Sequence, residues 1–358
     1  MIGTTRRVNP ALGTIDFTRL PSNGSKEARK DQNESIIYRL HPDREGRRLI
    51  FQVGTSDPDR AVAAARLVAA DVAGIDVNAG CPKPFSTSGG MGAALLRTPE
   101  KLCSILEALV RNIVPEFEIG ISVKIRLLET LEETENLVRK LVATGITGLT
   151  VHCRTTPMRP REKAIREQLR MISDICREAG VACLMNGDVV NRSQADQLIA
   201  EYGVDGAMIA TAAETNPSCF RSQGLLPWRE VVEQYLKTCM EVENRWGNTK
   251  YLLGHLVPGK EAVYRCITAS KNYTQICELL ELQHLHEDAR EADMKLNLEL
   301  EAREKTAQTK KNTRKSNKSA MAASGEIRRM HSPGIEARKK FLSTRGVDKQ
   351  EPAMALSI

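Results

Sequence analysis

Short apolar segments alternate along the chain with longer segments in which apolar residues recur at helical spacing. The short segments are typical of β-strands and lie at residues 48–53, 75–78, 119–126, 148–152, 181–186 and 205–210. Because helical segments separate these strands, we expect them to run parallel, joined by right-handed crossovers. Their apolar character is typical of a sheet that is buried on both faces. The pattern therefore predicts an α/β protein.

The segments between the strands carry helix start and stop signals. The pairs 57–58 (Asp-Pro) and 98–99 (Thr-Pro) each place a capping residue before a proline at the first helical position. Thr130 with Glu133 matches a capping box, and that helix is expected to stop near Gly145. Further helices are expected over residues 163–179 and 193–202.

Residues 74–96, GIDVNAGCPKPFSTSGGMGAALL, are the most informative part of the chain. They predict a buried strand, a loop with one cysteine, and a glycine-rich turn into a helix. Cys81 follows the strand end, which is where parallel α/β proteins carry their chemistry. A buried structural thiol is the alternative, because free cysteine is often a small core residue. The neighbouring Asn78, Lys83 and Ser86 favour a functional site.

This run resembles the active-site loop of the tRNA-dihydrouridine synthases, and most closely the eukaryotic class that reduces uridine 20 of the tRNA D-loop. The similarity covers residues 2–282 and is strongest over 46–217. It implies a TIM (β/α)₈-type barrel that binds FMN, which NADPH reduces. The family's first strand carries an Ala-Pro-Met segment that has no counterpart here. We therefore expect an α/β TIM-type barrel that lacks its first two strands, with residues 1–47 following the second.

The resemblance assigns flavin contacts to polar residues on otherwise apolar strands. Gln52 would contact the flavin ring, although a hydrogen-bonded core glutamine would look the same. Lys124 would contact the pyrimidine side of FMN, and a lysine inside a barrel strand is costly unless it is paired or binds an anion. His152 ends a strand and would lie against the flavin, although a lone histidine is most often structural.

The phosphate of FMN is expected at the ends of the last two strands, because barrels commonly bind phosphate there through backbone N–H groups. The candidate residues are Asn186, Gly187, Asp188, Ala210 and Thr211. The family commonly has arginine where Thr211 stands. A hydroxyl supplies no charge, so the affinity for phosphate is expected to fall by about 1–3 kcal/mol.

The catalytic and substrate residues also follow from the resemblance. Cys81 is expected to protonate C5 of uracil as a general acid, since a thiol with a reference pKa of about 8.5 is protonated at neutral pH. Residues expected to contact the substrate are Asn78, Lys83, Arg126, Arg154 and Arg159. Arg126 shares a strand face with Lys124 and is also placed to meet RNA phosphate at the entrance.

Composition limits the partners and the compartment. The 358 residues carry a net charge of +7, which favours a polyanionic partner such as tRNA. The nine cysteines show no CxxC pair and no metal-like spacing, so we expect reduced thiols in the cytosol or nucleus and no metal. No apolar run approaches the ~20 residues that span a bilayer, and the polar first residues predict no secretory signal. The sequence leaves the oligomeric state open.

Three domains are expected. Residues 1–224 form the catalytic barrel, 225–283 form a helical domain that holds tRNA in the family, and 284–358 form a solvated charged helix to about residue 305 and then a disordered basic tail. Two other functions remain open. An FMN-dependent oxidoreductase acting on free pyrimidines would use similar chemistry, and a catalytically silent RNA-binding remnant would fit a barrel with missing strands.

Overall fold

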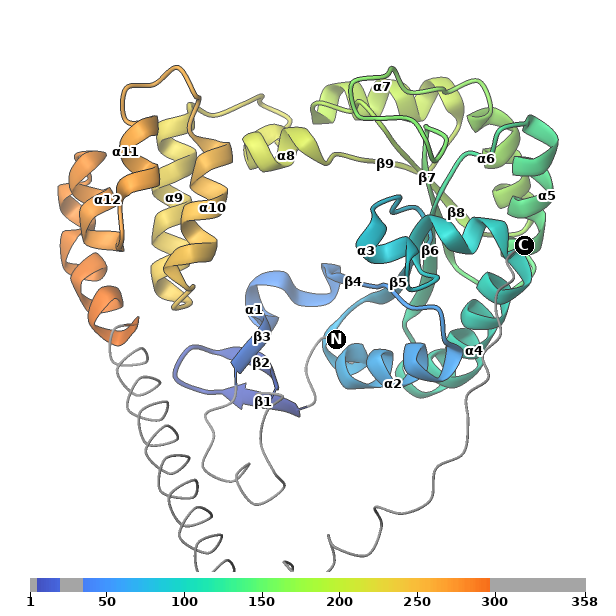
Figure 1. Cartoon of the computed structure of the whole chain (residues 1–358), viewed down its shortest axis with the longest axis horizontal. Helices are drawn as coiled ribbons and strands as arrows, with labels where there is room; N and C mark the ends of the chain where they lie inside the picture. The colour runs from blue at the N-terminus through green and yellow to red at the C-terminus, as the bar shows by residue number, and fades with distance from the viewer. Residues whose placement is uncertain (1–4, 20–34, 297–358) are drawn as a thin grey trace, which may run out of the picture. The chain divides into compact units, whose positions relative to one another are not determined.

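A single parallel sheet organises residues 50–208 of the molecule (Figure 1). The computed structural model describes residues 5–19 and 35–296. Its six parallel strands follow the order β4-β5-β6-β7-β8-β9. They are β4 (Ile50–Val53), β5 (Gly74–Asn78), β6 (Gly120–Arg126), β7 (Gly148–His152), β8 (Ala182–Asn186) and β9 (Gly206–Met208). The predicted α/β architecture is confirmed, although β9 is shorter than the predicted 205–210.

The two faces of this sheet differ in chemistry. One face carries fully buried apolar side chains, for example Ile75, Val123 and Val151. Five helices lie along that face (Figure 1), namely α2 (Pro58–Val68), α4 (Pro99–Phe117), α5 (Leu131–Val142), α6 (Leu169–Glu178) and α7 (Arg192–Tyr202). Strand alternation turns Asp76 and Thr150 to the opposite face, where both are also buried. At these positions the sheet is thus buried on both faces, as its apolar strands predicted, and the second face carries polar side chains.

Helix capping explains where several of these helices begin. Asp57 accepts the N–H of Arg60, and Thr130 forms the predicted capping box with Glu133. Helix α4 begins at Pro99 directly after Thr98, as predicted, but Thr98 does not cap it through its side chain. The backbone N–H of Thr98 bonds back into the preceding 3₁₀ turn.

Helix α6 begins six residues later than the predicted 163, at Leu169. The backbone before it is held by other partners. Arg154 donates to the carbonyls of Pro160 and Glu162, and the N–H of Ala164 donates to Asp188. These long-range hydrogen bonds hold the segment as a loop, which helical spacing in the sequence does not reveal.

An antiparallel sheet of three strands precedes the parallel one, and the sequence patterns did not predict it. It contains β1 (Thr5–Asn9), β2 (Thr14–Arg19) and β3 (Ser35–Leu40), and the one-turn helix α1 (Pro42–Glu45) follows. Phe17 of β2 is fully buried in the same hydrophobic cluster as the parallel sheet. Arg39 of β3 pairs with the buried Asp16 of β2 at 2.5 Å. These contacts give the segment a structural role.

The helical segment after the sheet has a hydrophobic cluster of its own. Its helices are α9 (Trp228–Glu241), α10 (Trp246–Leu256), α11 (Tyr264–Ala269) and α12 (Tyr273–Leu279). Tyr273 is fully buried there, and its hydroxyl donates to the carbonyl of Asn244 at 2.7 Å. Residues 286–296 are helical, and Ala289 and Ala292 are buried, so this part is not fully solvated as expected. The remainder of the expected tail, from 297 on, lies outside the described residues.

The predicted division into domains at residues 224 and 283 stays a prediction. Across residues 5–19 and 35–296, no helix is both long and apolar enough to cross a membrane.

Candidate functional site

Strand register collects the predicted site residues on the polar face of the parallel sheet. Neighbouring strands pair Asn78 with Lys124, Arg126 with His152, and His152 with Asn186. Paired residues on parallel strands point to the same face, so these side chains form two adjacent levels at the carboxyl ends of β5 to β8: Asn78 with Lys124, and Arg126 with His152 and Asn186. Residues separated by more than one hundred positions in the sequence therefore share one site.

Cys81 lies in a loop that is held firmly from two sides. The Oδ1 atom of Asn78 accepts the N–H groups of Gly80 and Cys81 at 3.1 and 3.0 Å. The Nε atom of Arg126 donates to the carbonyl of Gly80 at 2.8 Å. The peptide unit that joins Gly80 to Cys81 is thus fixed at both its N–H and its C=O. The thiol itself is partly exposed and free.

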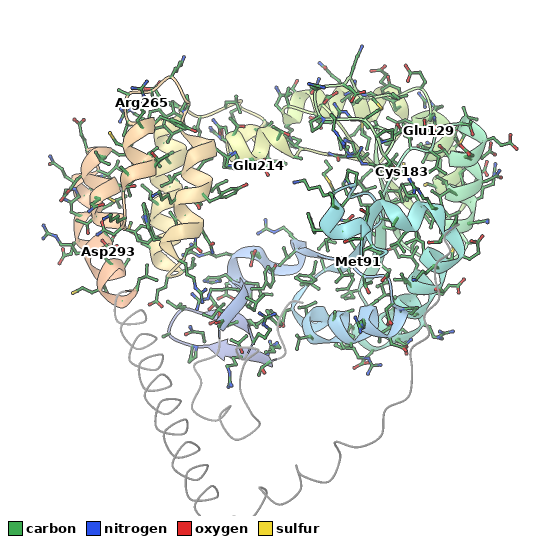
Figure 2. All side chains as sticks on the ribbon, in the orientation of Figure 1. Met91, Glu129, Cys183, Glu214, Arg265 and Asp293 are labelled. Carbon is green, nitrogen blue, oxygen red and sulfur yellow. The ribbon has the colours of Figure 1, made fainter. Side chains whose placement is uncertain are left out.

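The glycine-rich turn that follows is required by close packing. Gly92 has a φ of +58°, and a Cβ there would lie 2.4 Å from Ser86 Oγ and 2.5 Å from the carbonyl oxygen of Cys81. The next residue, Ala93, donates its N–H to that same carbonyl at 2.9 Å. Met91 of this turn lies beside helix α3 (Pro84–Thr87) in Figure 2. The turn therefore packs directly against the cysteine loop.

Arg126 is turned into the protein. It is 6% exposed, and besides Gly80 it donates to the carbonyl of Thr155 at 2.8 Å. Burial lowers the pKa of its guanidinium, with a further contribution from the charge of Arg154. The structure therefore places Arg126 between the cysteine loop and the loop after β7, and not at the entrance where RNA phosphate was expected.

Lys124 is half-buried on the same strand. Burial lowers the pKa of its ammonium to about 8, although the nearby carboxylate of Asp76 opposes that shift. Arg126 adds to the shift by repulsion. Lys124 is consequently mostly protonated at neutral pH and is poised to attract an anion.

His152 is held as a neutral ring. Burial lowers its pKa to about 3, helped by the positive charges of Lys124, Arg126 and Arg154. The Nη1 atom of Arg154 lies 3.2 Å from His152 Nε2. Because a guanidinium only donates, Nε2 accepts and the proton of the neutral ring is on Nδ1.

Arg154 holds the loop after β7 through its hydrogen bonds. It is 3% exposed and donates to Pro160, Glu162 and, at 2.5 Å, the carboxylate of Asp188. Burial raises the pKa of Asp188, but the bonds from Arg154 and Ala164 outweigh it and the net shift is downward. The expected contact of Arg154 with substrate stays a prediction, and the observed partners are all within the chain.

A cavity of about 610 Å³ lies at the carboxyl ends of β7, β8 and β9. His152, Asn186, Gly187, Asp188, Ala210 and Thr211, all predicted cofactor residues, line it. Gly187 has a φ of +130°, and a Cβ there would lie 3.1 Å from Ala164 Cβ. Thr211 begins the short helix α8 (Thr211–Thr215) and is exposed. The cavity therefore gathers the residues expected for the phosphate side of a flavin.

Two predicted substrate residues lie at the surface. Lys83 is exposed next to the cysteine loop, and Arg159 is exposed in the loop after β7. Arg159 lines a second cavity of about 650 Å³ together with Pro82 and Arg97. Lys83 and Arg159 are thus exposed cations, whereas Arg126 and Arg154 are buried.

The flavin contact of Gln52 stays a prediction, and two residues of its hydrogen-bond network, Asp76 and Ser122, were missed. Gln52 is exposed on strand β4, yet both ends of its amide are bonded. Its Nε2 donates to Asp76 Oδ2 at 2.7 Å, and its Oε1 accepts from Asn78 at 2.9 Å. Ser122 also donates to Asp76, at 2.7 Å. Asp76 is a charge inside an apolar strand, and that signal could have revealed it.

The structure thus defines a class: a parallel α/β protein with a cysteine loop after one strand and a lysine, a histidine and an asparagine on the same face at the adjoining strand ends. The described residues contain no group of three side chains suited to a metal ion. The chain belongs to the dihydrouridine synthase family, because the model of that family, Dihydrouridine synthase (Dus), matches residues 26–312.

Two relatives carry the same name. A tRNA-dihydrouridine(20) synthase (NAD(P)+) of Schizosaccharomyces pombe is 46% identical over 286 residues, covering 79% of this chain and 57% of the relative. The one from Saccharomyces cerevisiae is 40% identical over 288 residues, covering 78% and 73%. The chain therefore spans little more than half the length of the fission yeast relative.

Among solved structures, DHODH from Eimeria tenella in complex with ferulenol aligns with a TM-score of 0.33 and 16% identity. That alignment covers 60% of this chain and 67% of the other. A likeness at this level carries no functional argument.

Proposed function

We propose that this chain is an FMN-dependent tRNA-dihydrouridine synthase that reduces the C5=C6 bond of a uracil ring with NAD(P)H. The observation that carries the proposal is the cysteine loop after β5, which is held by Asn78 and Arg126 on the sheet face that also carries Lys124 and His152. The names of the two yeast relatives support a uridine at tRNA position 20 as the target.

The residues present fit FMN. The cavity of about 610 Å³ offers the loops after the last two strands to a phosphate, and Lys124 offers a half-buried cation to the pyrimidine side of the flavin. Neutral His152 stands between them. Thr211 has no charge to offer the phosphate. The backbone N–H groups of that loop would therefore contribute a larger share of the phosphate affinity.

The chemistry divides between cofactor and protein. FMN, when bound and reduced, supplies a hydride to C6 of uracil. Cys81 supplies the proton to C5, and the balance is one hydride and one proton added across one double bond. Asn78 and Arg126 hold the Cys81 backbone so that the thiol keeps its direction. A uracil stacked in RNA does not reach this site, so the nucleotide must leave its stack.

We further propose that the parallel sheet is an arc of a (β/α)₈ barrel. The two strands at its margins support this, because both expose surface that barrel closure would cover. Ile50 of β4 is 57% exposed, and no residue of β9 is buried.

The first test is the visible absorption spectrum of the full chain titrated with FMN. The proposal expects a bound-flavin spectrum near one FMN per chain, and a clearly lower affinity in the Lys124→Met variant. A chain that takes up no FMN would contradict it.

The second candidate is a chain that binds tRNA without turnover. The uncharged Thr211 and the exposed strand margins favour it. In that case the chain would retain tRNA in a gel-shift assay, yet it would form no dihydrouridine when FMN and NADPH are supplied.

A further inference from the structure

A chain of hydrogen bonds connects a buried carboxylate on β5 with the backbone of Cys81. Ser122 Oγ and Gln52 Nε2 both donate to Asp76, each at 2.7 Å. Asn78 Nδ2 donates to Gln52 Oε1 at 2.9 Å. Asn78 Oδ1 then accepts the Cys81 N–H at 3.0 Å. We call the sequence Asp76–Gln52–Asn78–Cys81 the amide relay.

Strand register creates this arrangement. The β4–β5 pairing places Gln52 beside Asp76, and the β5–β6 pairing places Ser122 on the other side. Asp76 and Asn78 share a face of β5 because they are two residues apart. The relay thus begins within the sheet and leaves it at the strand end.

Elementary chemistry fixes the direction of every bond in the relay. Burial raises the pKa of Asp76, opposed by its bonds from Gln52 and Ser122. In its ionised form the carboxylate only accepts, so Gln52 turns its NH₂ toward Asp76 and its oxygen toward Asn78. A backbone N–H only donates, so Asn78 must turn its oxygen toward Cys81 and its NH₂ toward Gln52. The two ends of the relay require the same orientation of both amides. Every hydrogen bond in the relay therefore joins a donor to an acceptor.

We propose that Asp76 is a positioning residue for Cys81, acting through the amides of Gln52 and Asn78. Asp76 is 7% exposed, and both of its carboxylate oxygens accept hydrogen bonds from neighbouring strands. Arg126 holds the Gly80 carbonyl of the same peptide unit from the other side. The inference rests on the proposed role of Cys81 as the acid, and it explains why an apolar strand carries a carboxylate.

A charge exchange along the relay tests this inference. In Gln52→Glu two carboxyl groups face each other, so the relay breaks at a pH where both are ionised, and exchange is therefore compared at neutral and at alkaline pH. Adding Asp76→Asn restores it, because the new amide donates to Glu at position 52 and accepts from Ser122. Asp76→Asn alone keeps the relay, since the Ser122 hydroxyl can accept from the amide while the amide oxygen faces Gln52.

The readout is hydrogen–deuterium exchange of the Cys81 loop in the full chain, which needs neither FMN nor tRNA. Gln52→Glu is expected to speed exchange at Gly80 and Cys81 roughly fivefold, the equivalent of one lost hydrogen bond. The double variant should return it to the wild-type rate. Peptides from β7 and β8 serve as the internal control and should not change.

Further variants separate loss of the relay from an effect of the added charge. Gln52→Met breaks the relay without adding charge, so it should speed exchange as Gln52→Glu does, and Asp76→Asn should not rescue it. Ser122→Ala removes a bond to Asp76 outside the relay and should leave the exchange unchanged. The inference would be overturned if the Cys81 loop exchanged at the wild-type rate in both Gln52→Glu and Gln52→Met. It would also be overturned if the double variant did not return to the wild-type exchange rate.

Failure of the proposed function has a different signature. The wild-type chain would then form no dihydrouridine from tRNA while the exchange pattern of the variants still followed the relay.

Discussion

At the scale of single residues, charge and burial decide what each side chain of the site can do. Lys124 and His152 lie on adjacent strands, and burial shifts both toward their neutral forms. The shifts have different consequences at neutral pH. Lys124, with a pKa of about 8, remains mostly a cation, whereas His152, with a pKa of about 3, is a neutral ring.

Lys124 should make the affinity for FMN depend on pH. Its ammonium attracts the anionic ligand below its pKa of about 8, and this attraction is lost as the pH rises through that value. We expect the Kd for FMN, measured by flavin fluorescence quenching, to rise between pH 7 and about pH 9. The Lys124→Met variant should bind more weakly and show no such rise. An equal rise in both proteins would remove Lys124 from the site.

His152 should make the folded state sensitive to acid. Its folded pKa of about 3 lies below the reference value of about 6.5, so the unfolded chain binds more protons between these values. The free energy of unfolding therefore falls as the pH drops from about 6.5 toward 3. In denaturant titrations over this pH range, the free energy of unfolding should fall less in the His152→Gln variant than in the wild type. Equal losses would contradict the neutral assignment.

At the scale of elements, the cysteine loop depends on the backbone conformation of its glycine turn. Gly92 adopts a φ of +58°, and an added Cβ would meet Ser86 and the Cys81 carbonyl. Gly92→Ala is therefore expected to destabilise the fold by more than about 1 kcal/mol and to displace Cys81.

Gly254→Ala is the matched control for this prediction. Gly254 lies inside α10 with open space around it. Alanine there should leave the free energy of unfolding unchanged or raise it by about 0.5–1 kcal/mol. Thermal unfolding measures both variants. A Gly92→Ala protein as stable as the control would show that the turn tolerates a side chain.

Local signals made most elements predictable from the sequence. The cap at Asp57, the capping box at Thr130 and all six parallel strands depend on residues close together in the chain. The late start of α6 was not predictable, because Arg154 and Asp188 hold the preceding loop from other strand ends.

The site was predictable in its residue types and less so in its connections. The family loop pointed to Cys81, and the register brings Lys124, His152 and Asn186 together as expected. The bonds of Asp76 and the inward turn of Arg126 depend on which residues face each other across neighbouring strands. A single sequence read along one strand does not contain that information.

At the scale of the whole molecule, the excess of positive charge should govern tRNA binding. The chain carries a net charge of +7, and contacts between cations and phosphates release counterions. We expect the tRNA association constant to fall steeply and log-linearly with salt concentration in a filter-binding or fluorescence-anisotropy titration. FMN binding, with a single phosphate, should change far less. A salt-independent tRNA affinity would contradict a phosphate-directed interface.

The most direct measurement of the central claim is dihydrouridine formation. Unmodified tRNA would be incubated with the full chain, FMN and NADPH, and its nucleosides analysed by mass spectrometry. The account predicts that the wild type converts one D-loop uridine and that Cys81→Ala, with FMN bound as in the wild type, converts it far more slowly. Wild-type protein that holds FMN yet forms no dihydrouridine, or Cys81→Ala with full turnover, would contradict it.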